Sequence, residues 1–297
     1  MDLARMESLV ASGRFEEKAC SSDTTSSYSI DSCMWAGKTE FGDVVLAKSP
    51  VYGKMLFIDE ELQSAESDEH IYHEHLVHPI LNSTASHKEK RVLVVGGGEG
   101  ATVREVLKWP ASSVKSVVWV DIDGELVDLC RTHLGYADEA VYTDPRVTFH
   151  AKDIRVFFAE NTDLFDVVIL DLPDPDVEYL REYGADTSAE DYEMYSPAFW
   201  AALKKNLVPT GQIVSHCGPV APGEDNQKWR AGLAWIDEVY KVPGSVAYHV
   251  NIPSFQSDWG FWMTCPSSNM MRFPPGVKVM DGFAQLQAFA WPAYWFR

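Results

Sequence analysis

The chain has 297 residues, of which 46% are hydrophobic and 23% charged, a composition typical of a globular protein with a large and a smaller domain. Its 44 acidic and 25 basic residues give a formal net charge of −19, which disfavours binding to nucleic acid or to anionic membranes. The five cysteines are scattered without a Cys-x-x-Cys pair, so neither a disulfide framework nor a zinc site is indicated. No apolar run approaches the ~18 residues of a membrane span. We therefore expect a cytoplasmic protein with no nucleic-acid or membrane partner.

The first residues predict little ordered structure. Residues 2–14 have the pattern of a short amphipathic helix. Residues 20–33 are rich in Ser, Thr and Asp and lack periodicity. We therefore expect residues 1–35 to form a mobile N-terminal segment.

The next part of the chain predicts a small β domain. Between Phe41 and Leu62, short apolar runs broken by glycine and charge are typical of β-hairpins. Residues 66–81 follow with helical spacing after an acidic first turn, and we expect Pro79 to end this helix. We assign residues 36–85 to the β-hairpin domain and its connecting helix.

Residues 86–297 predict a Rossmann-like, methyltransferase-type α/β domain with a parallel sheet. Its three apolar runs are continuous rather than alternating, as expected for strands covered on both faces, and helical patterns alternate with them. The acidic, tyrosine-rich residues 176–194 follow a strand end and predict either a substrate-covering loop or a solvated one. The expected strands include Val92–Val95, Val117–Val120 and Val167–Leu170, and the expected helices are 101–109, 124–134, 197–206 and 226–241.

A glycine-rich turn predicts a ligand at the start of this domain. Gly96-Gly97-Gly98-Glu99-Gly100 must turn from strand to helix while letting a ligand approach the backbone, which glycine allows. NAD, FAD or an S-adenosyl compound fits such a turn, as does a tight turn with no ligand. Asp121 ends the next strand, where a carboxylate binds ribose hydroxyls, so an adenosyl ligand is favoured. Asp153-Ile154 ends a third strand-like segment and predicts an adenine contact or a helix N-cap.

Glu99 points to a particular kind of donor. A fixed carboxylate beside the methionine carboxylate of ordinary S-adenosylmethionine costs about 1 to 4 kcal/mol at ~4 Å, for effective dielectric constants of roughly 80 to 20. The same carboxylate attracts an amine. We therefore expect a sulfonium donor that has lost its carboxylate and carries an aminopropyl arm.

Further polar residues lie at a strand end and at the domain junction. Asp171 and Asp174 follow the fourth strand beside the expected crevice, although a rigid Asp-Pro turn with solvated acids is the alternative. Tyr72 and His73 lie on the connecting helix and predict amine binding. The histidines of that helix do not match the full spacing of a zinc-binding helix, so no metal is expected.

Taken together, these motifs resemble the polyamine aminopropyltransferases, the family of spermidine, spermine and thermospermine synthases. The resemblance runs from about Phe41 to Cys265. It implies a small N-terminal β domain on a Rossmann-like domain, no permanently bound cofactor, decarboxylated S-adenosylmethionine as co-substrate, a methylthioadenosine by-product and a homodimer. The implied acceptor is a polyamine: spermidine giving thermospermine or spermine, or alternatively putrescine, as in a spermidine synthase. The segments GKMLFIDEELQSAESDEHIYHEHLVHP, VVGGGEGATVREVL, VDIDGELVDLCR and IPSFQSDWGFWM look most like the plant-type thermospermine synthases.

The resemblance also implies a role for each residue. Asp171 would accept the proton of the acceptor amine with help from Tyr72. The implied acceptor contacts are His73, Asp174 and Phe255, the last standing where spermidine synthases often have tyrosine. The implied donor contacts are the glycine loop with Gly96 and Gly98, Gln63 near the sulfur, Glu99 at the amine, Asp121 at the ribose, and Asp153 and Ile154 at the adenine.

Two departures from the family pattern concern the substrate sites. Gly42 stands where the family usually has a glutamine that contacts the donor, and Ser215-His216-Cys217 replaces a glutamine-bearing strand. These departures concern the identity of the acceptor more than the type of reaction. Two alternative functions also stay open: an S-adenosylmethionine methyltransferase, and a non-catalytic homologue that binds polyamines or nucleosides.

Overall fold

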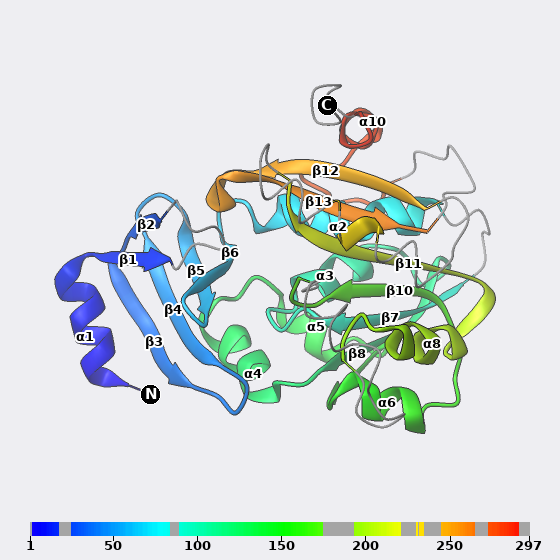
Figure 1. Cartoon of the computed structure of the whole chain (residues 1–297), viewed down its shortest axis with the longest axis horizontal. Coiled ribbons are helices and arrows are strands. Elements are labelled where there is room, and N and C mark those ends of the chain that lie inside the picture. Colours follow the sequence, from blue (N-terminus) through cyan, green and yellow to red (C-terminus); the bar gives the residue numbers. More distant parts are fainter. Residues whose placement is uncertain are drawn as a thin grey trace.

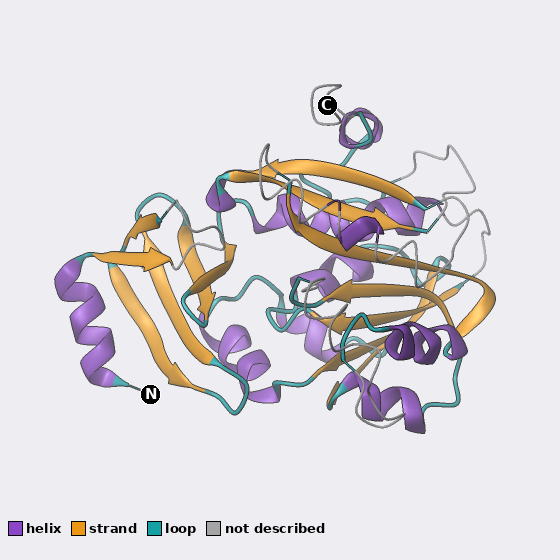
Figure 2. Cartoon of the chain, viewed as in Figure 1, coloured by secondary structure: helices purple, strands orange, loops and turns teal. Residues whose placement is uncertain are grey.

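The computed structural model describes residues 2–17, 25–83, 89–174, 193–220, 230, 232–234, 245–264 and 273–290. Within these residues, a small β domain lies beside a larger α/β domain (Figure 1). Helices cover both sides of the large sheet, whereas strands dominate the small domain (Figure 2). The loop predicted at 176–194 and the helix predicted at 226–241 fall largely outside the described residues.

The small domain contains an antiparallel sheet, and the hairpins predicted between Phe41 and Leu62 are confirmed. Neighbouring side chains of its third strand, β5 (Gly53–Ile58), point to opposite faces of the sheet. Met55 and Phe57 enter the core of the small domain, while Leu56 packs with residues of the large domain. Within the described residues the four strands pair in chain order: β3 (Ser32–Lys38), β4 (Asp43–Ser49), β5 (Gly53–Ile58) and β6 (Glu61–Ala65).

Residues 1–35, which we expected to form a mobile segment, contain regular secondary structure where the structure describes them. The predicted helix is present as α1 (Leu3–Ser12), and β1 (Arg14–Glu17) pairs antiparallel with β2 (Ser26–Ser29). Phe15 and Tyr28 enter the core of the small domain, and the Tyr28 hydroxyl donates to the carbonyl of Ser254 at 3.0 Å. A four-residue strand with one inward tyrosine is too short to show alternation in the sequence.

The connecting helix α2 (Glu69–Ser83) continues past Pro79, which we expected to end it. A proline inside a helix removes the hydrogen bond to the carbonyl four residues earlier, here that of His75. The hydroxyl of Tyr248 donates to this carbonyl at 2.8 Å. The helix therefore tolerates its proline because a residue far along the chain replaces the missing donor.

The large sheet has seven strands in the described residues, in the order β12-β13-β11-β10-β7-β8-β9. Strands β7 to β11 run parallel to their neighbours among themselves, and β13 is antiparallel to both β11 and β12. The three predicted apolar strands are confirmed. The bounds are β7 (Lys90–Gly96), β8 (Val114–Asp121), β9 (Val147–Ala151), β10 (Phe165–Asp171), β11 (Leu207–Pro219), β12 (Val246–Ile252) and β13 (Ser257–Met263).

Both faces of this sheet are buried, which explains the continuous apolar runs. Val94 packs with residues of α2 and α3, whereas its neighbour Val95 packs with residues of α6 and α8. None of the described helices is both long and apolar enough to cross a bilayer. The helices of this domain are α3 (Ala101–Leu107), α4 (Gly124–His133), α5 (Glu139–Thr143), α6 (Ile154–Glu160), α8 (Pro197–Lys205) and α10 (Gly282–Ala288), with a 3-10 turn η1 (Pro253–Phe255).

The topology places a crevice between two strand ends. From β7 the sheet continues through β8 and β9 in one direction and through β10 and β11 in the other. Ligands of such sheets bind at the carboxyl ends of the strands, where the order reverses. Gly96 at the end of β7 lies beside Asp171 at the end of β10. This is the edge where the sequence placed its candidate residues.

Candidate active site

The glycine loop brings the ends of β7 and β10 into direct contact. Gly96 and Gly97 have φ angles of 80° and 70°, a region that favours glycine. A Cβ atom on Gly96 would lie 2.0 Å from the carbonyl oxygen of Asp171, and one on Gly98 would lie 3.3 Å from Oδ2 of Asp121. The loop therefore needs glycine both for its backbone angles and for the close approach of two acids.

Asp171 is held by two hydroxyl groups. Its Oδ1 accepts a hydrogen bond from the Tyr72 hydroxyl at 2.6 Å, and its Oδ2 accepts one from Thr102 Oγ1 at 2.5 Å. Burial raises the pKa of Tyr72 well above its ordinary value, and the neighbouring Asp171 raises it further. Tyr72 therefore stays a neutral phenol that donates its proton to the carboxylate. Asp171 and Tyr72, which we expected to act together on the proton of the acceptor amine, are therefore in contact.

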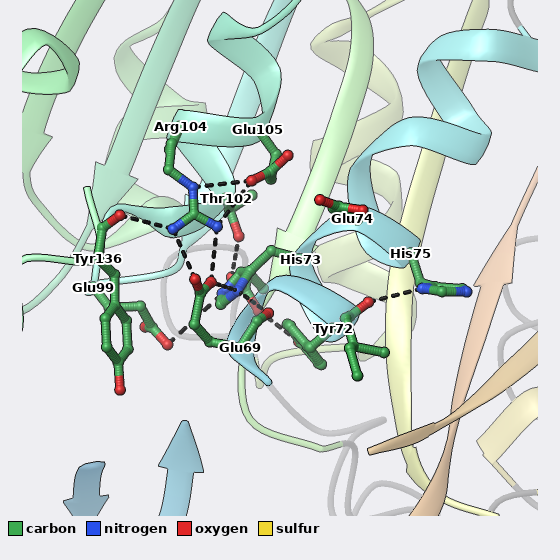
Figure 3. A network of polar contacts seen from close by, with 12 residues as sticks. Glu69, Tyr72, His73, Glu74, His75, Glu99, Thr102, Arg104, Glu105 and Tyr136 are labelled. Atoms are coloured by element: carbon green, nitrogen blue, oxygen red, sulfur yellow. Dashed lines mark hydrogen bonds and ion pairs between the residues drawn. The ribbon is translucent and has the colours of Figure 1, made fainter. Parts of the chain in front are cut away.

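A buried ion network anchors the same helix (Figure 3). His73 Nδ1 lies 3.0 Å from Glu69 Oε2, and Arg104 binds both carboxylate oxygens of Glu69, at 2.9 and 2.8 Å. Burial by itself would lower the pKa of His73, but the hydrogen bond and charge of Glu69 raise it to about 9. Burial opposes ionisation of Glu69, yet His73 and Arg104 lower its pKa to about 2. The network therefore carries charges of both signs at neutral pH.

The other ring nitrogen of His73 faces Glu99. His73 Nε2 lies 3.8 Å from Glu99 Oε1 and, within the described part of the chain, has no hydrogen-bond partner. Burial raises the pKa of Glu99, and the negative charge of Asp171 adds to this, whereas His73 lowers it. We expected His73 among the contacts of an acceptor amine. In the structure this ring nitrogen faces Glu99, and a contact of His73 with the acceptor stays a prediction.

The acids expected on the adenosyl side have different surroundings. Asp121 Oδ1 accepts from the backbone N–H of Asp123 at 2.9 Å, and burial together with the charge of Asp123 raises the pKa of Asp121 to about 7. Asp153 caps α6, accepting from the backbone N–H of Arg155 at 2.7 Å, and pairs with the Arg155 guanidinium at 2.6 Å. Ile154 packs in the hydrophobic core. The structure thus shows the N-cap, and the adenine contact of Asp153 stays a prediction.

Asp174 contacts an imidazole rather than solvent alone. His216 Nδ1 lies 3.2 Å from Asp174 Oδ1, and the Trp259 indole N–H points to the same nitrogen at 3.3 Å. A Cβ atom on Gly218 would lie 2.4 Å from Asp174 Oδ2, so glycine at this position leaves room for the acid. The ring of Phe255 lies 4.7 Å from that of Trp259, between centroids.

A narrow hollow joins several of the predicted residues. It lies between β6, the start of α2 and η1, and its lining includes Gln63, Tyr72, His73 and Phe255. The Gln63 side chain is exposed at this edge and donates to the carbonyl of Glu61 at 3.2 Å. The structure thus brings together residues from both domains that the sequence separated by almost two hundred positions.

Sequence reasoning did not identify several residues that hold this site. Thr102, the second residue of α3, donates to Asp171, and Arg104 anchors Glu69. Trp259 is half-buried, and its indole N–H contacts His216. The position of Thr102, two residues after the glycine loop, is a signal that could have been used. Nothing in the sequence indicates that Arg104 reaches Glu69.

The fold and the site define a class of protein: a Rossmann-like, methyltransferase-type α/β protein with an acid-rich crevice and a small N-terminal β domain. In the described residues, no group of three or more His, Cys, Asp or Glu side chains is arranged to hold a metal ion. Residues 69–273 match the family model for the spermine/spermidine synthase domain, and residues 15–66 match that for the spermidine synthase tetramerisation domain. The chain therefore belongs to the spermine/spermidine synthase family.

Named relatives agree with this assignment. The chain is 36% identical over 235 residues to polyamine aminopropyltransferase 2 of Pseudomonas aeruginosa, covering 79% of this chain and 62% of that protein. It is 33% identical over 248 residues to a thermospermine synthase of Arabidopsis thaliana, covering 83% of this chain and 68% of that protein. The chain thus spans about three fifths of the length of the Pseudomonas relative.

A solved structure shares the fold. A spermidine synthase in complex with the transition state analogue AdoDATO superimposes with a TM-score of 0.80 at 20% sequence identity. The match covers 95% of this chain and 92% of the solved one. Both the parallel sheet and the small N-terminal domain therefore lie within the matched region.

Proposed function

We propose that the protein moves the aminopropyl group of decarboxylated S-adenosylmethionine to a polyamine and releases methylthioadenosine. The observation that carries the proposal is the contact of Tyr72 with Asp171 at 2.6 Å, beside the loop that holds Glu99. Family membership and a relative solved with a transition state analogue support it. As acceptor we propose spermidine, giving thermospermine or spermine, and the match to a thermospermine synthase supports this choice. Putrescine is the second candidate.

The proposed reaction begins with proton removal from the acceptor. An amine with a pKa of about 10.4 must become neutral at pH 7, which costs about 4.6 kcal/mol. Each oxygen of Asp171 accepts one hydrogen bond and retains a lone pair for that proton. The neutral nitrogen then attacks the methylene next to the sulfonium, the carbon–sulfur bond breaks, and sulfur keeps the electron pair. A positioned base contributes about 10²–10⁴-fold to such a step.

The donor would lie across the carboxyl ends of β7 and β8. Glu99 would bind its amine, and Asp121 its ribose hydroxyls. We propose that the charge of His73 keeps the neighbouring Glu99 carboxylate ionised, as binding of the donor's ammonium group requires. Gln63 at the rim and the adenine contacts at Asp153 and Ile154 remain predictions.

The assembly and location of the protein are part of the proposal. The match to a tetramerisation domain supports an oligomer, and we propose a homodimer in the cytoplasm. We also propose that the connecting helix ends the first domain near residue 85 and that residues 86–297 form the catalytic domain.

The experiment supplies labelled decarboxylated S-adenosylmethionine together with spermidine or putrescine. We expect methylthioadenosine and a product one aminopropyl group longer, identified by mass spectrometry with fragmentation. A methylated product would identify a methyltransferase, and no product would identify a non-catalytic homologue. Asp171→Asn should leave donor binding nearly unchanged but stop turnover, while Asp163→Asn, at an exposed position just before β10, is the matched control. Near-normal turnover of the Asp171 variant would contradict the proposed base.

A further inference from the structure

His216 on β11 has an arrangement of partners that depends on its protonation state. The imidazole is almost completely buried, with 9% of its side chain exposed. Its Nε2 points at the carbonyl oxygen of Leu172 in a short contact. A carbonyl only accepts hydrogen bonds, so Nε2 carries a hydrogen whether the ring is neutral or charged.

The other nitrogen, Nδ1, has two partners that exclude each other. Asp174 Oδ1 lies 3.2 Å away and accepts a hydrogen, so this contact requires a protonated Nδ1. The Trp259 indole nitrogen lies 3.3 Å away and only donates, so this contact requires a lone pair on Nδ1. Protonation therefore selects Asp174, and deprotonation selects Trp259.

The surroundings of the ring favour the protonated state. Among the described residues, the charged groups that act on it are Asp174 and Asp171 at the end of β10, while neutral Tyr72 packs edge-on from α2. Trp259 stacks on it from β13, with ring centroids 6.1 Å apart. Burial by itself would lower the pKa of His216, but Asp174 and then Asp171 raise it above its ordinary value.

We propose that His216 controls how much of the Asp174 charge is available to a cationic acceptor, by exchanging Asp174 for Trp259 as the partner of Nδ1. This inference rests on the proposed function, in which Asp174 binds an ammonium group of the polyamine. The acceptor competes with the imidazolium for one carboxylate, since 42% of the Asp174 side chain is exposed and reachable. Acceptor binding therefore displaces the imidazolium and releases its proton.

Two consequences can be measured. Below the pKa of His216, the apparent affinity for the acceptor should rise about tenfold per pH unit, because only the fraction with neutral His216 binds without competition. Donor affinity should not follow this dependence. In the same pH range, acceptor binding should release close to one proton per site.

The test measures spermidine binding, with methylthioadenosine present, by calorimetry in two buffers of different ionisation enthalpy. The variant His216→Gln keeps a donor for the Leu172 carbonyl and an acceptor for the indole, but cannot titrate. It should lose the tenfold dependence and the proton release. Trp259→Phe keeps His216 and Asp174 but removes the partner of the neutral ring. In this variant the rise of the apparent spermidine affinity with pH should therefore occur at higher pH.

Nitrogen NMR of the wild-type protein gives a readout independent of turnover and of any variant. Neutral His216 should be the tautomer with hydrogen on Nε2. The proposal is overturned if wild type and His216→Gln show parallel affinity profiles and equal proton release, or if neutral His216 carries its hydrogen on Nδ1. An unshifted Trp259→Phe profile also overturns it. Absence of aminopropyl transfer, with His216-dependent proton release intact, would instead refute the proposed function alone.

Discussion

The buried pair of Glu69 and His73 predicts a large and pH-dependent loss of stability in the variant Glu69→Gln. The side chains of Glu69 and His73 are 4% and 1% exposed, so water screens their attraction little. A folded-state pKa of about 9 against an ordinary value of 6.5 corresponds to roughly 3 kcal/mol, at about 1.4 kcal/mol per pKa unit. Removing one partner of a buried pair commonly costs about 3–5 kcal/mol, which agrees with this size.

The sign of the pH dependence follows from the raised pKa. Stabilisation from a charged His73 is fully present below about pH 6.5 and is lost as the pH rises through about 9. The difference in unfolding free energy between wild type and Glu69→Gln should therefore shrink between these values. In the variant, burial should dominate and bring the pKa of His73 below its ordinary value.

Denaturant unfolding at several pH values, with NMR titration of His73, measures both effects. Glu139→Gln is the matched control because Glu139 pairs with Arg131 at the surface, where their side chains are 63% and 41% exposed. We expect this control to change stability little. A loss in Glu69→Gln no larger than in the control, or a His73 pKa that stays near 9, would refute the reasoning.

Three more predictions concern the loop, the helix proline and the donor. Gly96→Ala should abolish donor binding and destabilise the protein, because the added Cβ would lie 2.0 Å from the Asp171 carbonyl oxygen. Equilibrium dialysis with methylthioadenosine and thermal unfolding test this prediction. Wild-type affinity and wild-type stability would contradict it. Tyr248→Phe should lower the unfolding free energy by about 1–3 kcal/mol because the buried His75 carbonyl loses its donor, and an unchanged denaturation midpoint would count against it. Glu99→Gln should reduce the preference for decarboxylated over ordinary S-adenosylmethionine in competitive binding. An unchanged preference would contradict the proposal that Glu99 binds the amine of the donor.

The sequence specified the α/β domain well because its signals are local. Val92–Val95 and Val167–Leu170 are continuous apolar runs, as expected for strands covered on both faces, and they pair in parallel. The strand ends followed from the same pattern, so Gly96 and Asp171 were expected at one edge of the sheet. Their separation of 75 positions mattered little, because parallel strands place their carboxyl ends together.

Contacts between residues far apart in the chain could not be predicted from such local patterns. Pro79 carries a local signal for a helix end, and only the folded chain brings Tyr248 to the carbonyl it leaves free.

The sequence by itself determined which chemical groups this protein holds at the edge of its sheet: a glycine loop with one glutamate, two aspartates after a strand, and a tyrosine beside a histidine. Tertiary structure alone decided their charge states and partners. Burial by itself would lower the pKa values of His73 and His216, but the nearby carboxylates of Glu69 and Asp174, respectively, raise them. Desolvation and Coulomb energies depend on distances in space, and the order of residues along the chain does not contain those distances.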